Sequence, residues 1–84
     1  MEHWNGIPGD LGQIDPEATL RDAARRMRTL DVAALPVCEN DEFVGVVTAE
    51  DIAFRAVADG CDPNGTRVRD VMTWQMFFFD TSGG

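Results

Sequence analysis

The 84-residue sequence contains no long apolar run, no lysine and only one histidine. Its apolar runs fall well short of the roughly 20 residues that a membrane-spanning helix needs, so no membrane span or membrane partner is expected. The first residues have neither a basic start nor the apolar core of roughly 7–15 residues that marks a secretory signal. Together these absences predict a cytoplasmic protein.

Positive charge is also scarce. The chain carries 15 acidic residues against 7 basic ones, for a net charge of −8. This charge repels nucleic acids and anionic surfaces at long range, so no nucleic-acid partner is expected. Four of the seven arginines fall in one segment, at Arg21, Arg25, Arg26 and Arg28. A solvated helix face is the favoured interpretation of this segment, and a phosphate-binding patch is the alternative.

Metal-ligand spacings are missing as well. Cys38 and Cys61 do not form a Cys-x-x-Cys pair, and the lone His3 lies near the N-terminus, so no metal site is predicted. Cys38 is instead predicted to be a buried, reduced thiol at the end of an apolar strand.

The sequence also lacks a catalytic arrangement. Asp41-Glu42 and Glu50-Asp51 are adjacent carboxylates, but adjacency in sequence does not make them converge on one substrate. No nucleophile and base are paired, and no phosphate-binding Gly-rich loop is present. No catalytic residue is therefore assigned, and we do not expect the chain to be an enzyme.

Hydrophobic residues make up 44% of the chain, which is typical of a globular domain. A chain of this size buries only roughly 60–65% of its unfolded surface, so a partner is expected to add stability. The first helix is predicted over residues 16–30, because Asp15-Pro16-Glu17 has the features of a helix start. An apolar stripe at helical spacing follows, comprising Leu20, Ala23, Ala24, Met27 and Leu30.

A β-hairpin is predicted next, with apolar strands at 33–38 and 43–47 joined by a polar turn. Pro36 cannot donate a hydrogen bond to a neighbouring strand, which places the first strand at an edge or gives it an irregularity. A second helix is predicted over 49–59, ending at Gly60. Its apolar face consists of Ile52, Ala53, Ala56 and Val57.

Three weaker signals complete the chain: a short opening strand at 11–14, a helical turn within 66–72 and an apolar strand over 73–79. The predicted order is β-α-β-β-α followed by this last strand. It corresponds to a small α/β fold, a mixed sheet with two helices on one face.

Four segments resemble, in order and spacing, a single cystathionine-β-synthase (CBS) domain. They are Asp15-Pro16-Glu17-Ala18-Thr19-Leu20, Ala34-Leu35-Pro36-Val37, Gly45-Val46-Val47-Thr48-Ala49-Glu50-Asp51-Ile52 and Val68-Arg69-Asp70-Val71-Met72-Thr73. The resemblance implies a domain over 11–73, an N-terminal extension at 1–10 and an apolar tail at 74–84. Domains of this kind are regulatory modules that bind adenosine-containing ligands, such as AMP, ADP, ATP or S-adenosylmethionine, between paired copies.

Carried over by position, the resemblance assigns ligand contacts to six residues, and helical spacing adds Arg55 as a seventh. The Thr48 hydroxyl would contact a phosphate or ribose oxygen, and the Asp51 carboxylate would accept hydrogen bonds from the ribose hydroxyls. Arg55, one helical turn beyond Asp51, would pair with a phosphate. The adenine slot would be lined on one side by Ala34, Leu35 and Pro36 and on the other by Ile14. No further cofactor is implied.

The Thr48 to Asp51 spacing has a second interpretation, a capping box that closes the start of a helix. Both interpretations stay open, because one threonine can serve each role in turn. Glu50 is an acid where similar motifs often carry a base, which favours AMP or an adenosine-type ligand over ATP.

The sequence contains no internal repeat, although domains of this kind usually occur as tandem pairs. A homodimer is therefore expected to supply the second half of the cleft. The Phe77-Phe78-Phe79 tail is predicted to be buried at the dimer interface, with the start of a longer chain as the alternative. The functional hypothesis is a ligand sensor acting on an unidentified effector protein. Its alternative is a dimerisation or scaffold module without a physiological ligand.

Overall fold

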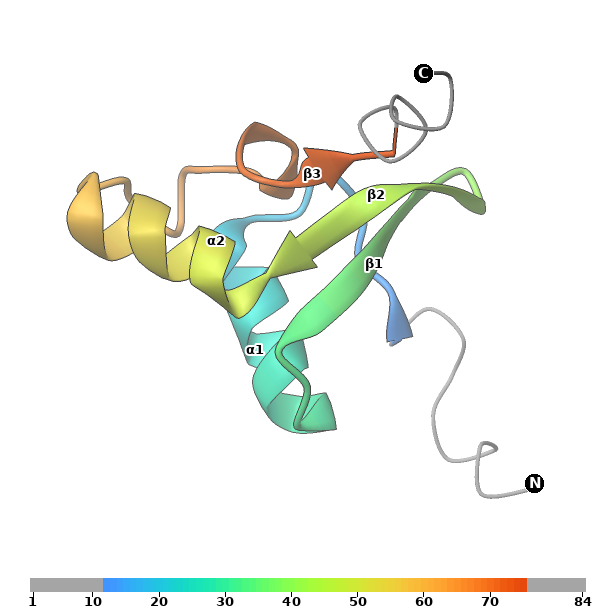
Figure 1. Cartoon of the computed structure of the whole chain (residues 1–84), viewed down its shortest axis with the longest axis horizontal. Coiled ribbons are helices and arrows are strands. Elements are labelled where there is room, and N and C mark those ends of the chain that lie inside the picture. The colour runs from blue at the N-terminus through green and yellow to red at the C-terminus, as the bar shows by residue number, and fades with distance from the viewer. Residues whose placement is uncertain (1–11, 76–84) are drawn as a thin grey trace, which may run out of the picture.

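A computed structural model describes residues 12–75 of the chain (Figure 1). The predicted N-terminal extension at 1–10 and the Phe77–Phe79 part of the tail lie outside the described residues. Among the residues that are described, no helix is long and apolar enough to cross a membrane.

The sheet has three antiparallel strands, β1 (Ala34–Glu39), β2 (Glu42–Thr48) and β3 (Thr73–Trp74), in the order β1-β2-β3 (Figure 1). The predicted hairpin is confirmed. Its turn contains Asn40 and Asp41 with positive φ angles of 54° and 67°, a conformation that asparagine and aspartate tolerate better than most residues.

The first strand lies at the edge of this three-stranded sheet, as Pro36 predicts. On its outer side β1 meets the opening segment, where Ile14 forms a parallel bridge with Val37 and donates its N–H to the Pro36 carbonyl at 3.0 Å. Of the predicted strand at 11–14, the described residues 12–14 show a single bridge, at Ile14. A bulge between Val37 and Cys38 shifts the register, and Cys38 is a free, half-buried thiol rather than a buried one.

Helix α1 (Leu20–Leu30) begins at the N-cap Thr19, so the predicted start at residue 16 is wrong. Asp15-Pro16-Glu17-Ala18 forms a turn instead, in which the Asp15 carboxylate accepts the Glu17 N–H at 2.8 Å. The Asp15 carbonyl accepts the Ala18 N–H at 3.0 Å. Aspartate followed by proline suits the first two positions of a β-turn as well as it suits a helix start.

Tertiary contacts hold this turn in place. The backbone N–H groups of Val68 and Arg69 donate to the carbonyls of Ala18 and Pro16 at 2.8 and 2.9 Å. Val68–Asp70 forms a short 3₁₀ helix, η4, which confirms the predicted helical turn within 66–72.

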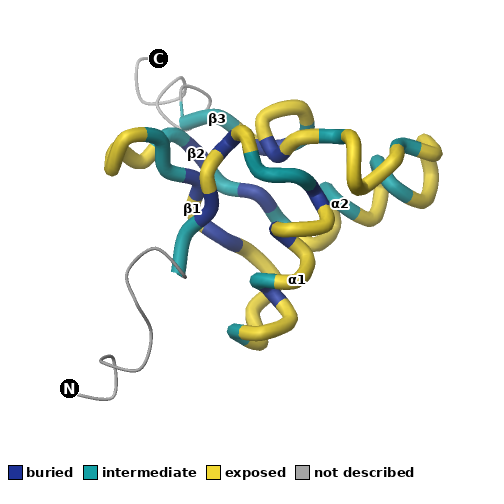
Figure 2. The backbone as a smooth tube through the Cα atoms, turned by 180° about the vertical axis from the view of Figure 1, so that it is seen from behind, coloured by how far each residue is buried: buried dark blue, intermediate teal, exposed yellow. Residues whose placement is uncertain are grey.

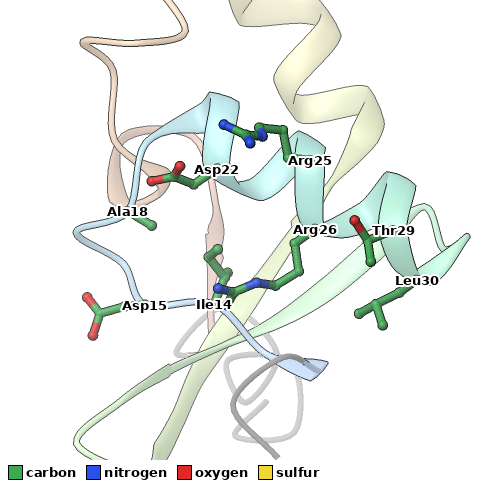
Figure 3. Close-up of a pocket in the computed structure, with 8 residues that line it drawn as sticks. All are labelled: Ile14, Asp15, Ala18, Asp22, Arg25, Arg26, Thr29 and Leu30. Atoms are coloured by element: carbon green, nitrogen blue, oxygen red, sulfur yellow. The ribbon is translucent and has the colours of Figure 1, made fainter. Parts of the chain in front are cut away.

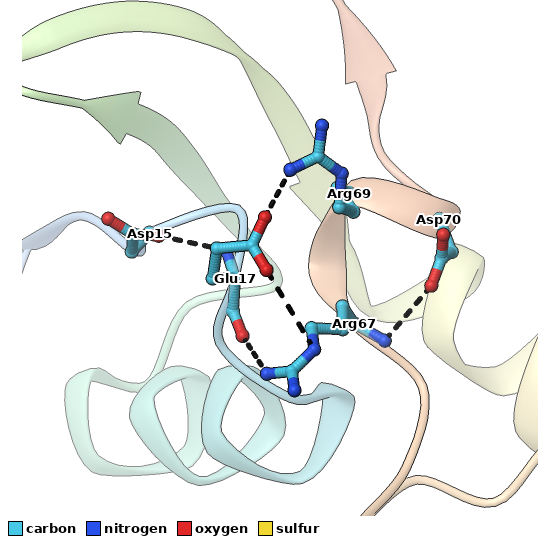
Figure 4. A network of polar contacts seen from close by, with 5 residues as sticks. All are labelled: Asp15, Glu17, Arg67, Arg69 and Asp70. Atoms are coloured by element: carbon cyan, nitrogen blue, oxygen red, sulfur yellow. Dashed lines mark hydrogen bonds and ion pairs between the residues drawn. The ribbon is translucent and has the colours of Figure 1, made fainter.

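The Glu17 carboxylate lies between two arginines of the η4 segment (Figure 4). It pairs with Arg67 at 3.8 Å and more closely with Arg69. The hydrogen bond to Glu17, and then the charge of that carboxylate, raise the pKa of Arg69 above its ordinary value. The Arg69 guanidinium also lies 5.8 Å from the centre of the Trp74 ring, within cation–π range. These side chains connect the turn before α1 with the segment leading into β3.

The core lies between α1 and one face of the sheet, with buried residues along β1 and β2 (Figure 2). Alternation along β1 and β2 points every second side chain to this face. The buried hydrophobic residues are Ile14, Leu20, Ala23, Met27, Leu35, Val37, Val47, Val68 and Met72.

The second helix differs from its prediction in its second half. Helix α2 (Ala49–Ala53) continues into a π-helical turn, η3 (Phe54–Ala58), before Gly60 adopts a left-handed φ of 73° as predicted. No residue of α2 or η3 is buried, although the partly buried Ile52 packs against the core. Ala24 of the α1 stripe is exposed too. These residues form an apolar surface on the helix layer.

Gly45 permits the close approach of β3 to β2. A Cβ atom at this position would lie 2.2 Å from the Thr73 carbonyl oxygen and 2.6 Å from the Met72 Cε. The Thr73 atom is part of the backbone and cannot rotate away as a flexible side chain would. The β3 strand would therefore have to move.

We expect Gly45→Ala to lower the free energy of unfolding by about 1–3 kcal/mol, because the added methyl group overpacks the β2–β3 contact. Urea denaturation followed by circular dichroism measures the change. Gly65→Ala is the matched control, since a Cβ there would meet only Asp62, at an ordinary contact distance of 3.5 Å. Equal stability of the two variants would contradict the steric argument.

Candidate functional site

The junction of β2 and α2 places Thr48 and Asp51 in direct contact. The Thr48 hydroxyl accepts the Asp51 N–H at 3.0 Å, and the Asp51 Oδ2 accepts the Thr48 N–H at 3.0 Å. This is a complete capping box. The capping interpretation of this spacing is therefore confirmed.

Capping occupies only part of the Asp51 carboxylate. Its Oδ2 atom serves the cap, and no described residue donates a hydrogen bond to its Oδ1 atom. The side chain is half-buried, so it remains accessible to a ligand. Glu50, the preceding residue, is exposed and places a second negative charge close by.

The outer face of the sheet brings Ala34 and Pro36 next to this junction. Ala34 pairs with Thr48 across the β1–β2 ladder, and Pro36 pairs with Val46. Both Ala34 and Pro36 are exposed, and the carbonyl of Ala33 accepts the Ala49 N–H at 2.8 Å. One end of the outer face thus combines a small apolar surface with a hydroxyl and a carboxylate.

Two of the residues assigned to the adenine slot face the opposite way. Leu35 and Ile14 are only 1% and 2% exposed, and both belong to the core. Their side chains therefore do not join Ala34 and Pro36 on the outer face. Ile14 still lies beside β1 through its backbone, whose carbonyl accepts the Cys38 N–H at 2.9 Å.

Arg55 lies in the π-helical turn and faces its own helix. Its Nε atom lies 3.2 Å from the Asp59 carboxylate, as an i,i+4 ion pair without the alignment of a hydrogen bond. The side chain is 44% exposed, so this pairing is weak enough to be exchanged for another anion.

A cavity that the sequence did not predict lies on the flank of α1 (Figure 3). It has a volume of about 310 Å³ and is bounded by the opening segment and by polar residues at helical spacing. Its lining residues are Ile14, Asp15, Ala18, Asp22, Arg25, Arg26, Thr29 and Leu30. Arg26 crosses its floor and donates to the Gln13 carbonyl. The spacing of Asp22, Arg26 and Thr29 along one flank is the signal that could have revealed it.

This cavity does not contain the Thr48–Asp51 pair, so it is separate from the candidate site. Its two arginines are balanced by Asp15 and Asp22, which leaves no net charge to attract an anion. Within residues 12–75, no group of three or more His, Cys, Asp or Glu side chains is close enough to hold a metal ion.

Comparison with known proteins places this geometry in context. The family model of the CBS domain matches residues 10–57, more than half of the 84-residue chain. The match includes the Ala34-Leu35-Pro36-Val37 segment and the Thr48 to Asp51 junction.

Individual relatives agree with the family match. Hypoxic response protein 1 of Mycobacterium tuberculosis is 34% identical over 70 residues, covering 82% of this chain and 49% of that protein. Among solved structures, a cystathionine β-synthase domain protein fused to a Zn-ribbon-like domain aligns with a TM-score of 0.69 and 33% identity. This alignment covers 73% of the present chain and 87% of the other.

A second solved structure, the hexameric CBS-CP12 protein from bloom-forming cyanobacteria, aligns with a TM-score of 0.67 and 32% identity. This alignment covers 76% of the present chain and 38% of the other. The chain spans about half the length, or less, of the curated relatives that it matches.

Removing the Thr48 cap should show how much the capping box contributes to the stability of the fold. We expect Thr48→Ala to lower the free energy of unfolding by about 0.5–2 kcal/mol, because the Asp51 N–H loses its acceptor. Urea denaturation reports the change. Thr29→Ala, on the exposed flank of α1, serves as the control and should leave stability nearly unchanged. If both variants lose the same free energy, the cap contributes nothing particular to stability.

Proposed function

The chain belongs to the CBS domain family, whose members serve as regulatory modules, and from this premise we propose that it binds an adenosine-containing ligand. The proposed site is the outer face of the sheet at the β2–α2 junction. AMP, or a ligand of similar charge, suits this site better than ATP, because Glu50 and Asp51 together repel additional phosphate charge.

One observation carries the proposal: two of the segments that resemble the family, 34–37 and 45–52, meet on the outer face of the sheet. The register of β1 and β2 sets Ala34 opposite Thr48, and Asp51 contacts Thr48 directly. The apolar surface of Ala34 and Pro36 suits an adenine ring, while a hydroxyl and a carboxylate at its end suit a ribose.

Asp51 can hold the helix cap and the ligand at once. With Oδ2 on the Thr48 N–H, the Oδ1 atom accepts a hydrogen bond from a ribose hydroxyl. The Thr48 hydroxyl accepts the Asp51 N–H and still has its own proton to donate to a ligand oxygen. Arg55 reaches a phosphate only by leaving Asp59.

A second copy of the chain completes the proposed cleft. The outer sheet face presents Ala34, Pro36 and Val46, and no described helix covers it. Pairing two such faces about a two-fold axis encloses a ligand between equivalent Thr48–Asp51 junctions. A ligand held by both copies favours one relative orientation of the subunits, and this shift is what an effector protein would detect.

A dimerisation or scaffold module without a ligand is the second candidate. The capping box favours it, because the reciprocal hydrogen bonds already give Thr48 and Asp51 a structural role. Under this alternative the outer sheet face mediates assembly alone.

Calorimetry with AMP, ADP, ATP and S-adenosylmethionine separates the two candidates. We expect AMP or S-adenosylmethionine to bind more tightly than ATP, and Asp51→Ala to abolish binding because the ribose loses its hydrogen-bond acceptor. Absence of binding by all four compounds at millimolar concentration, with assembly intact, would establish the scaffold alternative.

The matched control for this experiment is Asp70→Ala. Asp70 also caps a short helix, accepting the Arg67 N–H at 3.3 Å, but it lies on η4 rather than at the β2–α2 junction. The Asp70→Ala variant should therefore retain ligand binding. If Asp51→Ala and Asp70→Ala both lose ligand binding, the effect of Asp51→Ala is due to the loss of a helix cap and not to the loss of a ligand contact.

A further inference from the structure

The cavity on the flank of α1 has no role in the proposed adenosine site. It lies between α1 and residues 14–18 of the opening segment, and we call it the α1 cavity (Figure 3). Its volume of about 310 Å³ is at the lower end of the roughly 300–1,000 Å³ that small-molecule sites occupy. A compact ligand therefore suits it best.

The polar groups of the α1 cavity are arranged in order along the helix. Asp22 lies about one turn before Arg25 and Arg26, and Thr29 lies about one turn after Arg25. Asp15, in the turn that precedes α1, lies at the same end of the cavity as Asp22 (Figure 3). Two carboxylates thus occupy one end, and two guanidinium groups follow them along the helix.

Asp22 and Arg25 are available to a ligand. Both are exposed, and neither side chain forms an ion pair or a hydrogen bond with any residue of the described part of the chain. The hydrogen bond recorded for Asp22 uses its backbone N–H, which the Thr19 hydroxyl accepts at 3.1 Å. Arg26 differs, since it is half-buried and donates to the Gln13 carbonyl. Arg25 is therefore the arginine that we expect to contact a ligand.

The end of the α1 cavity away from Asp22 is apolar. Leu30 lies there, half-buried and packed against the core (Figure 3). Ile14 and Ala18 contribute further apolar atoms to the lining. One small cavity therefore presents negative groups, positive groups and an aliphatic surface, in this order.

We propose that the α1 cavity binds a free α-amino acid with an aliphatic side chain, such as leucine. The ligand's ammonium group pairs with Asp22, its carboxylate pairs with Arg25, and its side chain packs towards Leu30. The inference goes beyond the proposed adenosine site and does not depend on it, because neither Thr48 nor Asp51 lines this cavity.

Charge balance favours a zwitterion over other small ligands. The cavity carries two arginines and two aspartates, and a free amino acid likewise has one group of each sign and no net charge. A simple anion would be repelled by the carboxylates, and a metal ion would be repelled by the arginines. A ligand with both charges satisfies the two ends together.

An NMR titration that follows the backbone amide signals tests the proposal. We expect leucine at millimolar concentration to shift the signals of Asp22, Arg25 and Thr29 and to leave those of Thr48 and Asp51 unchanged. N-acetyl-leucine lacks the ammonium group and leucinamide lacks the carboxylate, so each should bind about tenfold more weakly than leucine. The absence of a response to leucine overturns the proposal. Equal binding of either analogue overturns it too, because a single charge would then be enough.

Two substitutions test which charges pair. Asp22→Asn should remove the preference for leucine over N-acetyl-leucine, because the ammonium group loses its partner. Arg25→Gln should remove the preference for leucine over leucinamide, because the carboxylate loses its partner. Both positions are exposed, so the circular dichroism spectra should stay unchanged.

Arg28→Gln is the matched control for these substitutions. It makes the same change at an exposed position of α1 that does not line the cavity, and it should leave both preferences intact. If the preferences survive Asp22→Asn and Arg25→Gln, or are lost equally in Arg28→Gln, the α1 cavity is not the binding site.

The adenosine site and the α1 cavity can fail separately. Arg25→Gln should leave the calorimetric titration with AMP unchanged, and Asp51→Ala should leave the leucine titration unchanged. A flat AMP titration beside an intact response to leucine rejects the adenosine site alone. Binding of AMP without any response to leucine rejects the α1 cavity alone.

Discussion

The register of the β1–β2 pair determines the placement of both the core and the candidate site. Leu35 opposite Val47 faces α1, whereas Ala34 opposite Thr48 faces outward. Because side chains alternate along a strand, a shift by one residue would put the site residues into the core and the core residues into solvent. The two positive-φ residues of the hairpin turn and the close contact at Gly45 resist such a shift.

The β2–α2 junction combines a structural role with the proposed binding role in few atoms. The Thr48–Asp51 capping box fixes where the strand ends and the helix begins, and it also fixes the orientation of a carboxylate with one oxygen to spare. A ligand bound at this position finds its hydrogen-bonding groups already ordered, so less conformational entropy is lost on binding. Capping and binding are therefore compatible roles of one pair of residues.

Sequence reasoning succeeded where the deciding forces are local. The hairpin, the Gly60 stop and the Thr48–Asp51 pair depend on turn chemistry and on residues a few positions apart. It failed at the start of α1, because Asp15-Pro16 suits a turn equally well and the distant Val68–Arg69 segment stabilises that turn. It also assigned Leu35 to the ligand slot, although strand alternation points its side chain inward.

The sequence by itself determined the family, the order of the elements and the pairing of a threonine with an aspartate, since each rests on spacing along the chain. Tertiary structure alone decided which apolar face is covered. Helix α2 has the apolar periodicity of a core helix, yet Phe54 and Val57 of its π-helical continuation are exposed to solvent. Periodicity shows that a face must be covered, whereas the packing of distant segments determines what covers it.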